Sequence, residues 1–219
     1  MFSKIRKLKE KGYIPDIIFD IGAYHGDWTR ECLEIYPQKK YLLFEPNEHV
    51  RLSSLKNTRN IKIFNSLLND KNIEVDWYQM KLTGDSMFRE KTKHYINSQT
   101  IKKNSVTLNH VLNEKKGILE NCSKILIKID SQGAEIPILK GATDILHITD
   151  FIILELPLFG EYNQNVPSFL EHIKFMDDIG FIPYDFLESH YVNDFNVQID
   201  MLFINKNHKF NETVQKDIL

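Results

Sequence analysis

The chain has few cysteines, no excess of charge of one sign and no long apolar run, and each absence excludes a class of protein. Cys32 and Cys122 are the only cysteines, and neither has CxxC or metal-ligand spacing, so we expect reduced thiols in a cytoplasmic protein and no metal site. The formal net charge of −2 disfavours nucleic-acid binding. No apolar run approaches the ~20 residues that span a bilayer, and the charged N-terminus lacks the apolar core of a signal peptide.

The composition is that of a folded globular protein. Hydrophobic residues make up 42% and charged residues 26% of the 219 residues, which disfavours disorder and suits one α/β domain with a sizeable core. We therefore expect a single domain over residues 1–219. It would consist of a short N-terminal helix at 3–12, a core at about 16–206 and a tail at 207–219.

Apolar strands alternate with helical segments along the chain. We expect strands at 16–21, 41–45, 61–64, 73–80, 100–107, 124–130, 150–156, 181–187 and 197–204. Helices are expected at 27–36, 47–57, 108–112, from about 135, and at 167–179. This alternation predicts a mostly parallel, doubly wound sheet that ends in an antiparallel pair.

Acidic residues end several of the predicted strands. Asp20, Glu45, Asp130 and Glu155 each lie at or near the carboxyl end of an apolar run. Parallel strands joined by right-handed crossovers place these ends on one edge of the sheet, which is where open α/β sheets bind ligands. We therefore expect a ligand site that is rich in carboxylates.

The turn after the first strand contains Gly22 and Gly26, in a spacing that differs from the GxGxxG of dinucleotide-binding folds. The pattern favours a nucleoside without phosphates, and S-adenosylmethionine (SAM) fits: Asp20 would attract its amino group, and the helix N-terminus at Asp27 its carboxylate. Glu45 would accept both ribose hydroxyls. The alternatives are a glycine turn needed only for packing and a Glu45 that serves only the next turn.

Three sequence blocks make the chain resemble the FkbM family of SAM-dependent methyltransferases, over about residues 16–206. The matching segments are Asp20-Ile21-Gly22-Ala23 with Gly26, Phe44-Glu45-Pro46, and Lys128 to Glu135 followed by Leu139 to Ala142. Weaker matches are Gly84-Asp85-Ser86, Glu155 and Ile199 to Ile204. One departure is Tyr24, where many members have asparagine, so a side-chain contact of that asparagine cannot be assumed here.

The resemblance implies a Rossmann-like class I methyltransferase fold and SAM-dependent O-methylation of a hydroxyl on a sugar, glycan or related small molecule. The residues expected to bind the cofactor are Asp20, Gly22, Ala23, Tyr24, Gly26, Glu45, Pro46, Asn47, Ser66, Leu67 and Asp130. Ser66 and Leu67 would contact the adenine. No nucleic acid or membrane partner is expected, and the protein would be a monomer or homodimer.

Transfer to a neutral hydroxyl calls for a base that takes its proton. Asp130 is the first choice, with an orienting or turn-stabilising role as the alternative. Glu135 is the second choice, although a carboxylate in the first turn of a helix is also favoured by the helix dipole. Glu155 would orient the acceptor or complete a carboxylate cluster. These three acids could instead hold a divalent ion, but their spacing is not diagnostic and we expect no metal.

The segment 82–99 reads as a long loop, and long loops of compact domains are often functional lids. Ser86, Arg89 and His94 are its candidate acceptor contacts, and Phe159 would form the opposite wall. The alternative is an irregular surface connection. Other functions remain open: a catalytically silent binding protein with the same fold, an RNA methyltransferase, which the net charge disfavours, and an NAD-dependent sugar enzyme, which the missing GxGxxG disfavours.

Overall fold

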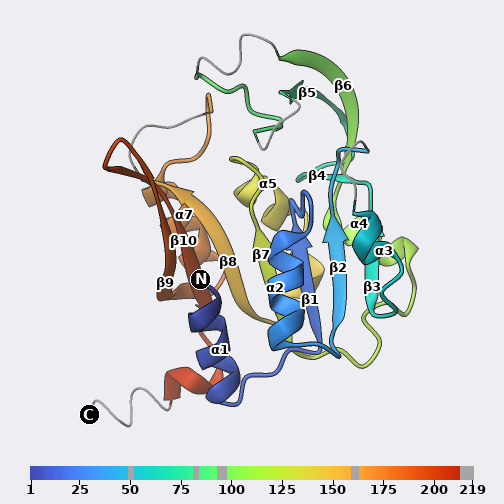
Figure 1. Ribbon diagram of the computed structural model, residues 1–219, viewed down its shortest axis with the longest axis vertical. Helices are drawn as coiled ribbons and strands as arrows, with labels where there is room; N and C mark the ends of the chain where they lie inside the picture. Colours follow the sequence, from blue (N-terminus) through green and yellow to red (C-terminus); the bar gives the residue numbers. More distant parts are fainter. Residues whose placement is uncertain (49–51, 81–83, 93–97, 159–162, 213–219) are drawn as a thin grey trace.

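The computed structural model describes residues 1–48, 52–80, 84–92, 98–158 and 163–212. Within them, a seven-stranded sheet has the order β3-β2-β1-β7-β8-β10-β9 (Figure 1). Its strands are β1 Ile17–Ile21, β2 Lys40–Phe44, β3 Ile61–Phe64, β7 Ile125–Ile129, β8 Thr149–Pro157, β9 Phe181–Val192 and β10 Phe195–Asn205. The first five strands in the order are parallel, whereas β10 is antiparallel to both β8 and β9. The predicted parallel sheet with an antiparallel C-terminal pair is confirmed.

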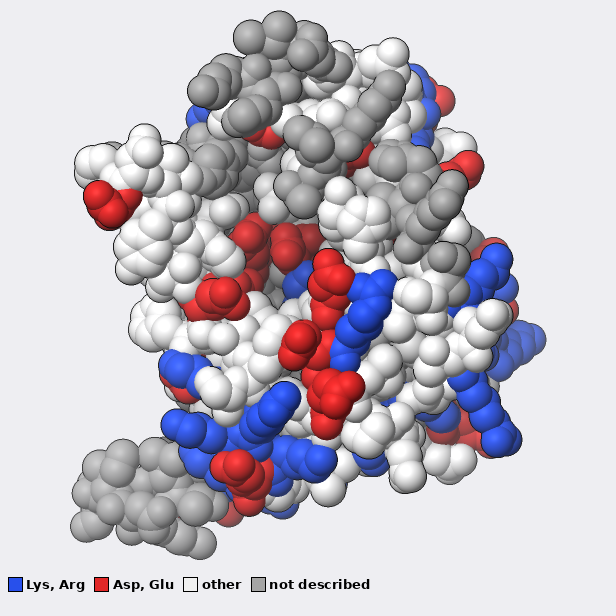
Figure 2. All heavy atoms as spheres, viewed as in Figure 1, with Lys and Arg blue, Asp and Glu red and all other residues white. Residues whose placement is uncertain are grey.

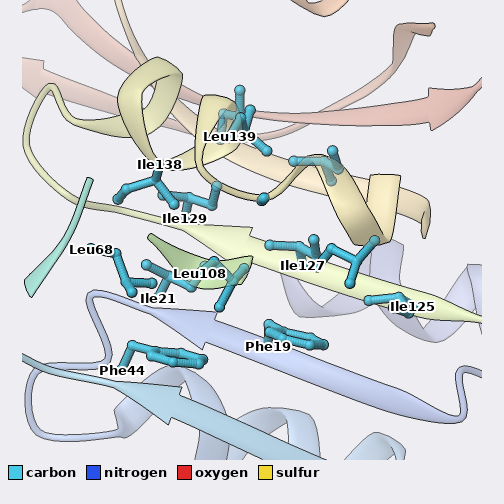
Figure 3. Packing of buried hydrophobic residues seen from close by; sticks show 14 of the residues in the cluster. Phe19, Ile21, Phe44, Leu68, Leu108, Ile125, Ile127, Ile129, Ile138 and Leu139 are labelled. Carbon is cyan, nitrogen blue, oxygen red and sulfur yellow. The ribbon is translucent and has the colours of Figure 1, made fainter. Parts of the chain in front are cut away.

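Helices cover both faces of this sheet, as the predicted double winding requires. One face packs against α1 Phe2–Glu10, α2 Asp27–Ile35 and α3 Ser53–Lys56. The other packs against α4 Leu108–Glu114, α5 Glu135–Lys140, α6 Thr143–Leu146 and α7 Phe169–Asp178. All five residues of β1 and of β7 are buried, because the side chains on each face of the sheet pack against a layer of helices. Figure 3 shows Phe19 of β1 and Ile127 of β7 in one hydrophobic cluster with Leu139 of α5, on the face that α4 to α7 cover.

A second, smaller sheet lies near the carboxyl ends of β1 and β2 (Figure 1). It pairs β4 Leu67–Leu68, β6 Gln99–Val106 and β5 Glu74–Gln79 in the order β4-β6-β5. The predicted strands at 73–80 and 100–107 are therefore confirmed. β4 was not predicted, since two residues carry no periodic pattern. The described part of the predicted loop at 82–99 is tied to this sheet by the pairing of Ser86 with Tyr78.

The predicted helix over 47–57 is wrong in its extent. Among the described residues of this stretch only Ser53–Lys56 is helical, and Asn47 lies outside any helix. Asn47 instead takes part in a local contact, because the Glu45 carboxylate accepts its main-chain N–H at 2.9 Å. None of the helices in the described ranges has the length and apolar character needed to cross a membrane.

Candidate active site

A cavity of about 570 Å³ opens at the carboxyl ends of β1, β2, β7 and β8, within the range usual for small-molecule sites. In the space-filling view, acidic side chains gather around a hollow near the middle of the face (Figure 2). Residues from both sheets and from the turns between strands and helices line it. They include Gly22, Tyr24, Glu45, Pro46, Asn47, Ser66, Leu67, Trp77, Met87, Asp130, Gln132, Glu155 and Gln198.

The turn after β1 is held tightly against neighbouring strands. The N–H groups of Gly22 and Ala23 both donate to the carbonyl of Phe44, at 3.0 and 3.1 Å. Gly22 has φ +74° and Gly26 has φ +79°, and a methyl group on Gly26 would lie 2.4 Å from Leu55. Gly22 lines the cavity, whereas Ala23 is buried and Gly26 packs on α3. Packing alone thus explains Gly26, and contacts of Ala23 and Gly26 with the cofactor stay predictions.

Glu45 follows β2 and points into the cavity. Its Oε2 accepts the N–H of Tyr24 at 2.8 Å, and its Oε1 accepts that of Asn47 at 2.9 Å. Burial raises the pKa of Glu45, against the opposing effect of these two hydrogen bonds. Because a carboxylate oxygen accepts more than one hydrogen bond, each oxygen can still accept a hydroxyl. The geometry therefore fits a ribose diol, with the backbone on both sides fixing the carboxylate.

Asp20 lies inside β1 and is fully buried. Its Oδ2 accepts the hydroxyl of Thr29 on α2 at 2.6 Å, and its Oδ1 lies 3.6 Å from Nζ of Lys128. Burial raises the pKa of Asp20, although Lys128 and Thr29 act in the opposite direction. Asp20 is thus set behind the residues that line the cavity, and its expected contact with the cofactor amino group stays a prediction.

Lys128 joins Asp20 to Asp130. This lysine is buried in the middle of the sheet, and its Nζ lies 3.2 Å from Oδ2 of Asp130. Burial alone would lower the pKa of the Lys128 ammonium, but Asp130 and Asp20 outweigh that effect and raise it. The cation therefore stays charged and offsets two carboxylates at the edge of the sheet. Sequence reasoning gave Lys128 no role, although a lysine inside an apolar strand was a signal for a buried partner.

Glu155 lies on β8 and faces the same cavity. Its Oε2 accepts two amide N–H groups, from Gln132 at 3.0 Å and from Gln198 at 3.1 Å. The Gln132 amide also lies 3.4 Å from Oδ1 of Asp130, so it links the two acids. Neither glutamine was predicted: Gln132 falls in a turn, and Gln198 comes from an antiparallel strand at a sequence distance that no motif reveals.

Glu135 is the first residue of α5 and is buried behind the turn that precedes it. Its Oε1 accepts from the N–H and hydroxyl of Ser131 at 2.9 and 3.0 Å, and from the N–H of Gly133 at 3.3 Å. Its Oε2 lies 3.8 Å from Nε2 of His172. Glu135 thus lies in the first turn of α5, as its alternative role as a helix carboxylate requires, and its contacts also hold the preceding turn, a role that was not predicted. It lines a smaller cavity behind the main one.

The matching family model is the Methyltransferase FkbM domain, and it covers residues 20–183. The chain belongs to the FkbM methyltransferase family. The prediction that the chain is a SAM-dependent methyltransferase of this family is thereby confirmed. The family match does not identify the molecule that accepts the methyl group. No curated protein sequence matches the chain significantly.

Solved structures show the same fold at low sequence identity. Burkholderia thailandensis 1,6-didemethyltoxoflavin-N1-methyltransferase, with 1,6-didemethyltoxoflavin and S-adenosylhomocysteine bound, is 10% identical with a TM-score of 0.52; the match covers 94% of this chain and 77% of that one. Magnesium protoporphyrin IX methyltransferase from Synechocystis PCC 6803, with SAM bound, is 8% identical with a TM-score of 0.51; coverage is 93% and 77%. The predicted Rossmann-like class I methyltransferase fold is confirmed.

In this FkbM methyltransferase, Pro46, Asn47, Ser66 and Leu67 line one part of the cavity together with Trp77. The indole N–H of Trp77 donates to Oδ1 of Asn47 at 3.3 Å, and the ring is buried. The predicted adenine contacts Ser66 and Leu67 thus line the cavity, and their contact with adenine stays a prediction. Trp77 was missed because an aromatic in a strand usually reads as core.

The predicted acceptor contacts Ser86 and Arg89 lie in different environments. Ser86 is buried and donates its hydroxyl to the main-chain carbonyl of Gln132 at 3.0 Å, so it anchors the turn; Arg89 is exposed. His94 and Phe159 lie outside the described residues. Met87 and Glu90, which were not predicted, line the cavity from the same segment. The described residues hold no group of three or more acids, histidines or cysteines arranged as a metal site.

Proposed function

We propose that this methyltransferase uses SAM to methylate a hydroxyl group of a sugar, glycan or related small molecule. One observation carries the proposal: a single cavity joins Gly22 and Glu45 to the carboxylates of Asp130 and Glu155. Binding elements for a nucleoside and proton acceptors for a hydroxyl thus face the same space.

The residues present fit the cofactor. Glu45, with its two backbone donors, would accept the ribose hydroxyls. Asn47, Leu67 and Trp77, which line the cavity, would contact the adenine of SAM. Because Gly22 has no side chain, the methionine part of SAM could lie close to the main chain there. When bound, SAM supplies a methyl group on a positively charged sulfur. Asp130, which lines the same cavity as Gly22 and Tyr24, would supply a carboxylate to offset that charge.

The remaining part of the cavity has the character of a hydroxyl-binding site. Gln132 and Gln198 provide amide groups, Glu155 provides an acceptor, and Met87 and Ile138 provide apolar surface. Such a lining can orient a polyol through several hydrogen bonds while it excludes water. Fixing an oxygen in line with a bound methyl group can contribute up to ~7–11 kcal/mol to lowering the barrier, by analogy with intramolecular reactions.

A direct test combines calorimetry with an acceptor screen. Titration with SAM should give 1:1 binding to the wild type, and no binding would favour the silent scaffold. Incubation with methyl-labelled SAM and separate pools of monosaccharides, oligosaccharides, sugar nucleotides and RNA should then label a hydroxyl of a carbohydrate or small molecule. Labelling confined to RNA, or to a nitrogen or carbon of the product as located by mass spectrometry and NMR, would contradict the proposal.

A further inference from the structure

Glu155 stands out in the acceptor half of the cavity because two side-chain amides hold it from one side. We propose that Glu155 is the catalytic base that takes the proton of the acceptor hydroxyl, and that Gln132 and Gln198 are positioning residues that aim its carboxylate. The inference rests on the proposed hydroxyl acceptor and replaces Asp130, the first choice from sequence, in that role.

The hydrogen bonds leave one oxygen of Glu155 available. Both amides donate to Oε2, at 3.0 and 3.1 Å. Within the described residues no protein donor is recorded for Oε1, and Glu155 lines the cavity. Two donors on one oxygen fix the rotation of the carboxylate and direct the other oxygen. A carboxylate arranged in this way can accept a proton from a bound hydroxyl without first losing a partner.

Asp130 is less suited to the same task. Its Oδ2 lies 3.2 Å from the Lys128 ammonium, and its Oδ1 lies 3.4 Å from the Gln132 amide. Both oxygens of Asp130 therefore already have a protein partner, and an acceptor hydroxyl would have to compete with these contacts. Asp130 is better suited to offset the positive charge of the cofactor than to bind a proton.

The surroundings of Glu155 favour its protonated form and so strengthen it as a base. Burial raises its pKa well above the ordinary value, and the carboxylates of Asp130, Asp200 and Glu135 add to the rise, while Lys128 opposes it. Two histidines stand behind these acids: His190 lies 2.8 Å from Asp200, and His172 lies 3.8 Å from Glu135. A base is most effective when its pKa approaches the working pH, so this environment suits proton transfer.

The backbone of Gln132 is held by two segments that are distant from it in the sequence. Gln132 has φ +56°, a left-handed backbone conformation that is energetically unfavourable for a residue with a side chain of this size. Its carbonyl accepts the Ser86 hydroxyl at 3.0 Å and the Asn163 amide at 2.6 Å. These two bonds hold the strained turn, and through the Gln132 amide they determine where the Glu155 carboxylate points.

The chemistry balances with this assignment. The acceptor oxygen forms its bond to the methyl carbon as the carbon–sulfur bond breaks, and that electron pair stays on sulfur. The hydroxyl proton passes to Glu155, which releases it to solvent after the product leaves. No metal, oxidant or further reactant is needed.

The kinetic test compares four variants on the acceptor found in the screen. Glu155→Gln should lower kcat about 100- to 10,000-fold, the usual contribution of general base catalysis. Calorimetry should show the same SAM affinity as in the wild type. Gln198→Leu and Gln132→Asn should each move the acid limb of the pH profile of kcat to higher pH. Asparagine is chosen at position 132 because it tolerates a positive φ but is too short to reach Glu155. The control Glu188→Gln, at an exposed position of β9, should change neither kcat nor its pH profile.

A second measurement needs no acceptor. In carboxyl-¹³C glutamate NMR, the resonance missing from Glu155→Gln should titrate well above the ordinary ~4.3 of a glutamate. Gln198→Leu should raise that midpoint further, because an ionised carboxylate loses a donor. An ordinary midpoint, or near-normal turnover by Glu155→Gln while Asp130→Asn is inactive, overturns the assignment. If SAM binds but no hydroxyl in the screen is methylated, the proposed acceptor class fails and the role of Glu155 as its base fails with it. If a hydroxyl is methylated but the midpoint is ordinary, the Glu155 assignment fails alone.

Discussion

Gly22 lies against the main-chain carbonyl of Asp130, so that a methyl group built on Gly22 would come within 1.8 Å of that oxygen. The same glycine has φ +74°. The two residues end neighbouring strands, β1 and β7, and the N–H of Asp130 donates to the carbonyl of Ile21 at 3.0 Å. The first turn of the sheet and the central acid are therefore placed by one main-chain contact.

Replacing Gly22 by alanine should disrupt this contact. The methyl group meets a carbonyl rather than a flexible side chain, so β1 and β7 must separate, and we expect a loss of about 3 kcal/mol or more in the free energy of unfolding. Urea denaturation measures it. Gly180→Ala is the matched control: Gly180 also has a positive φ, +89°, but nothing lies within 4 Å of the added methyl. Its cost should stay at about 1–2 kcal/mol. Equal losses in both variants would contradict the explanation.

The strand ends were predictable from the sequence because they depend on local patterns. Apolar runs that stop at Asp20, Glu45 and Asp130 give the positions of β1, β2 and β7, and a parallel sheet brings their ends to one edge. The contacts inside the site were less accessible. Gln198 reaches Glu155 only because β10 inserts antiparallel beside β8, a pairing set by tertiary structure.

The contacts of Lys128 could not be predicted from the sequence either. Its position in the sequence block was visible, but the block does not tell which acids it contacts. That depends on the register that sets Asp20 opposite Lys128 across β1 and β7. A helix after Glu45 was expected from Pro46 and Asn47, but among the described residues of this stretch only Ser53–Lys56 is helical, and the Glu45 carboxylate accepts the main-chain N–H of Asn47.

Lys128→Met should destabilise the protein strongly and in a pH-dependent manner. The change leaves the carboxylates of Asp20 and Asp130 without their cation, and breaking a buried ion pair costs about 3–5 kcal/mol. The pKa of Asp20 is already raised by burial, and loss of Lys128 raises it further. A carboxyl group whose folded pKa is raised destabilises the folded state as pH rises through that pKa. The deficit should therefore be larger at pH 8 than at pH 5.

Urea titrations of the wild type and Lys128→Met at the two pH values measure this effect. The double variant Lys128→Met with Asp20→Asn is the control, because a neutral amide removes the unpaired charge and should recover part of the loss. A deficit that is the same at pH 5 and pH 8 would show that lost packing, rather than an unpaired carboxylate, explains the destabilisation.

Tyr24 adopts φ +44°, a conformation that asparagine tolerates better than an aromatic residue does. Tyr24→Asn should therefore leave the free energy of unfolding unchanged or raise it by up to about 1 kcal/mol. The hydrogen bond from the N–H of residue 24 to Glu45 involves only the main chain and should persist. Tyr24→Val is the contrasting variant, because a β-branched residue disfavours this region. Thermal unfolding that ranks valine at or above asparagine would refute the argument.

His190 and Asp200 form a pH-sensitive contact on the β9–β10 hairpin. The Asp200 carboxylate, 2.8 Å from Nε2, raises the pKa of His190 above its ordinary value of about 6.5 through a hydrogen bond. Stabilisation from this contact is therefore fully present below about pH 6.5 and is lost as the pH rises through the raised pKa. Proton NMR of the imidazole should give a midpoint above the ordinary value, and Asp200→Asn should lower it. An unchanged midpoint in Asp200→Asn would exclude the carboxylate as the cause.

Glu45 gives the sharpest test of how the cofactor is held. Glu45→Ala removes the acceptor for a pair of hydroxyls, and SAM affinity should weaken by about 1–3 kcal/mol, the cost of leaving buried donors unpaired. The same side chain also accepts the N–H groups of Tyr24 and Asn47, so part of the loss could come from a displaced turn.

Adenosine and 2′-deoxyadenosine separate these two causes. Calorimetry of the wild type should show weaker binding of the deoxy compound, and in Glu45→Ala the two nucleosides should bind almost equally, because the group that distinguishes them is gone. Glu48→Gln, an exposed acid three residues further along the chain, is the control and should keep the wild-type preference. If Glu45→Ala weakens both nucleosides but preserves their ratio, the carboxylate supports the turn and does not bind the ribose.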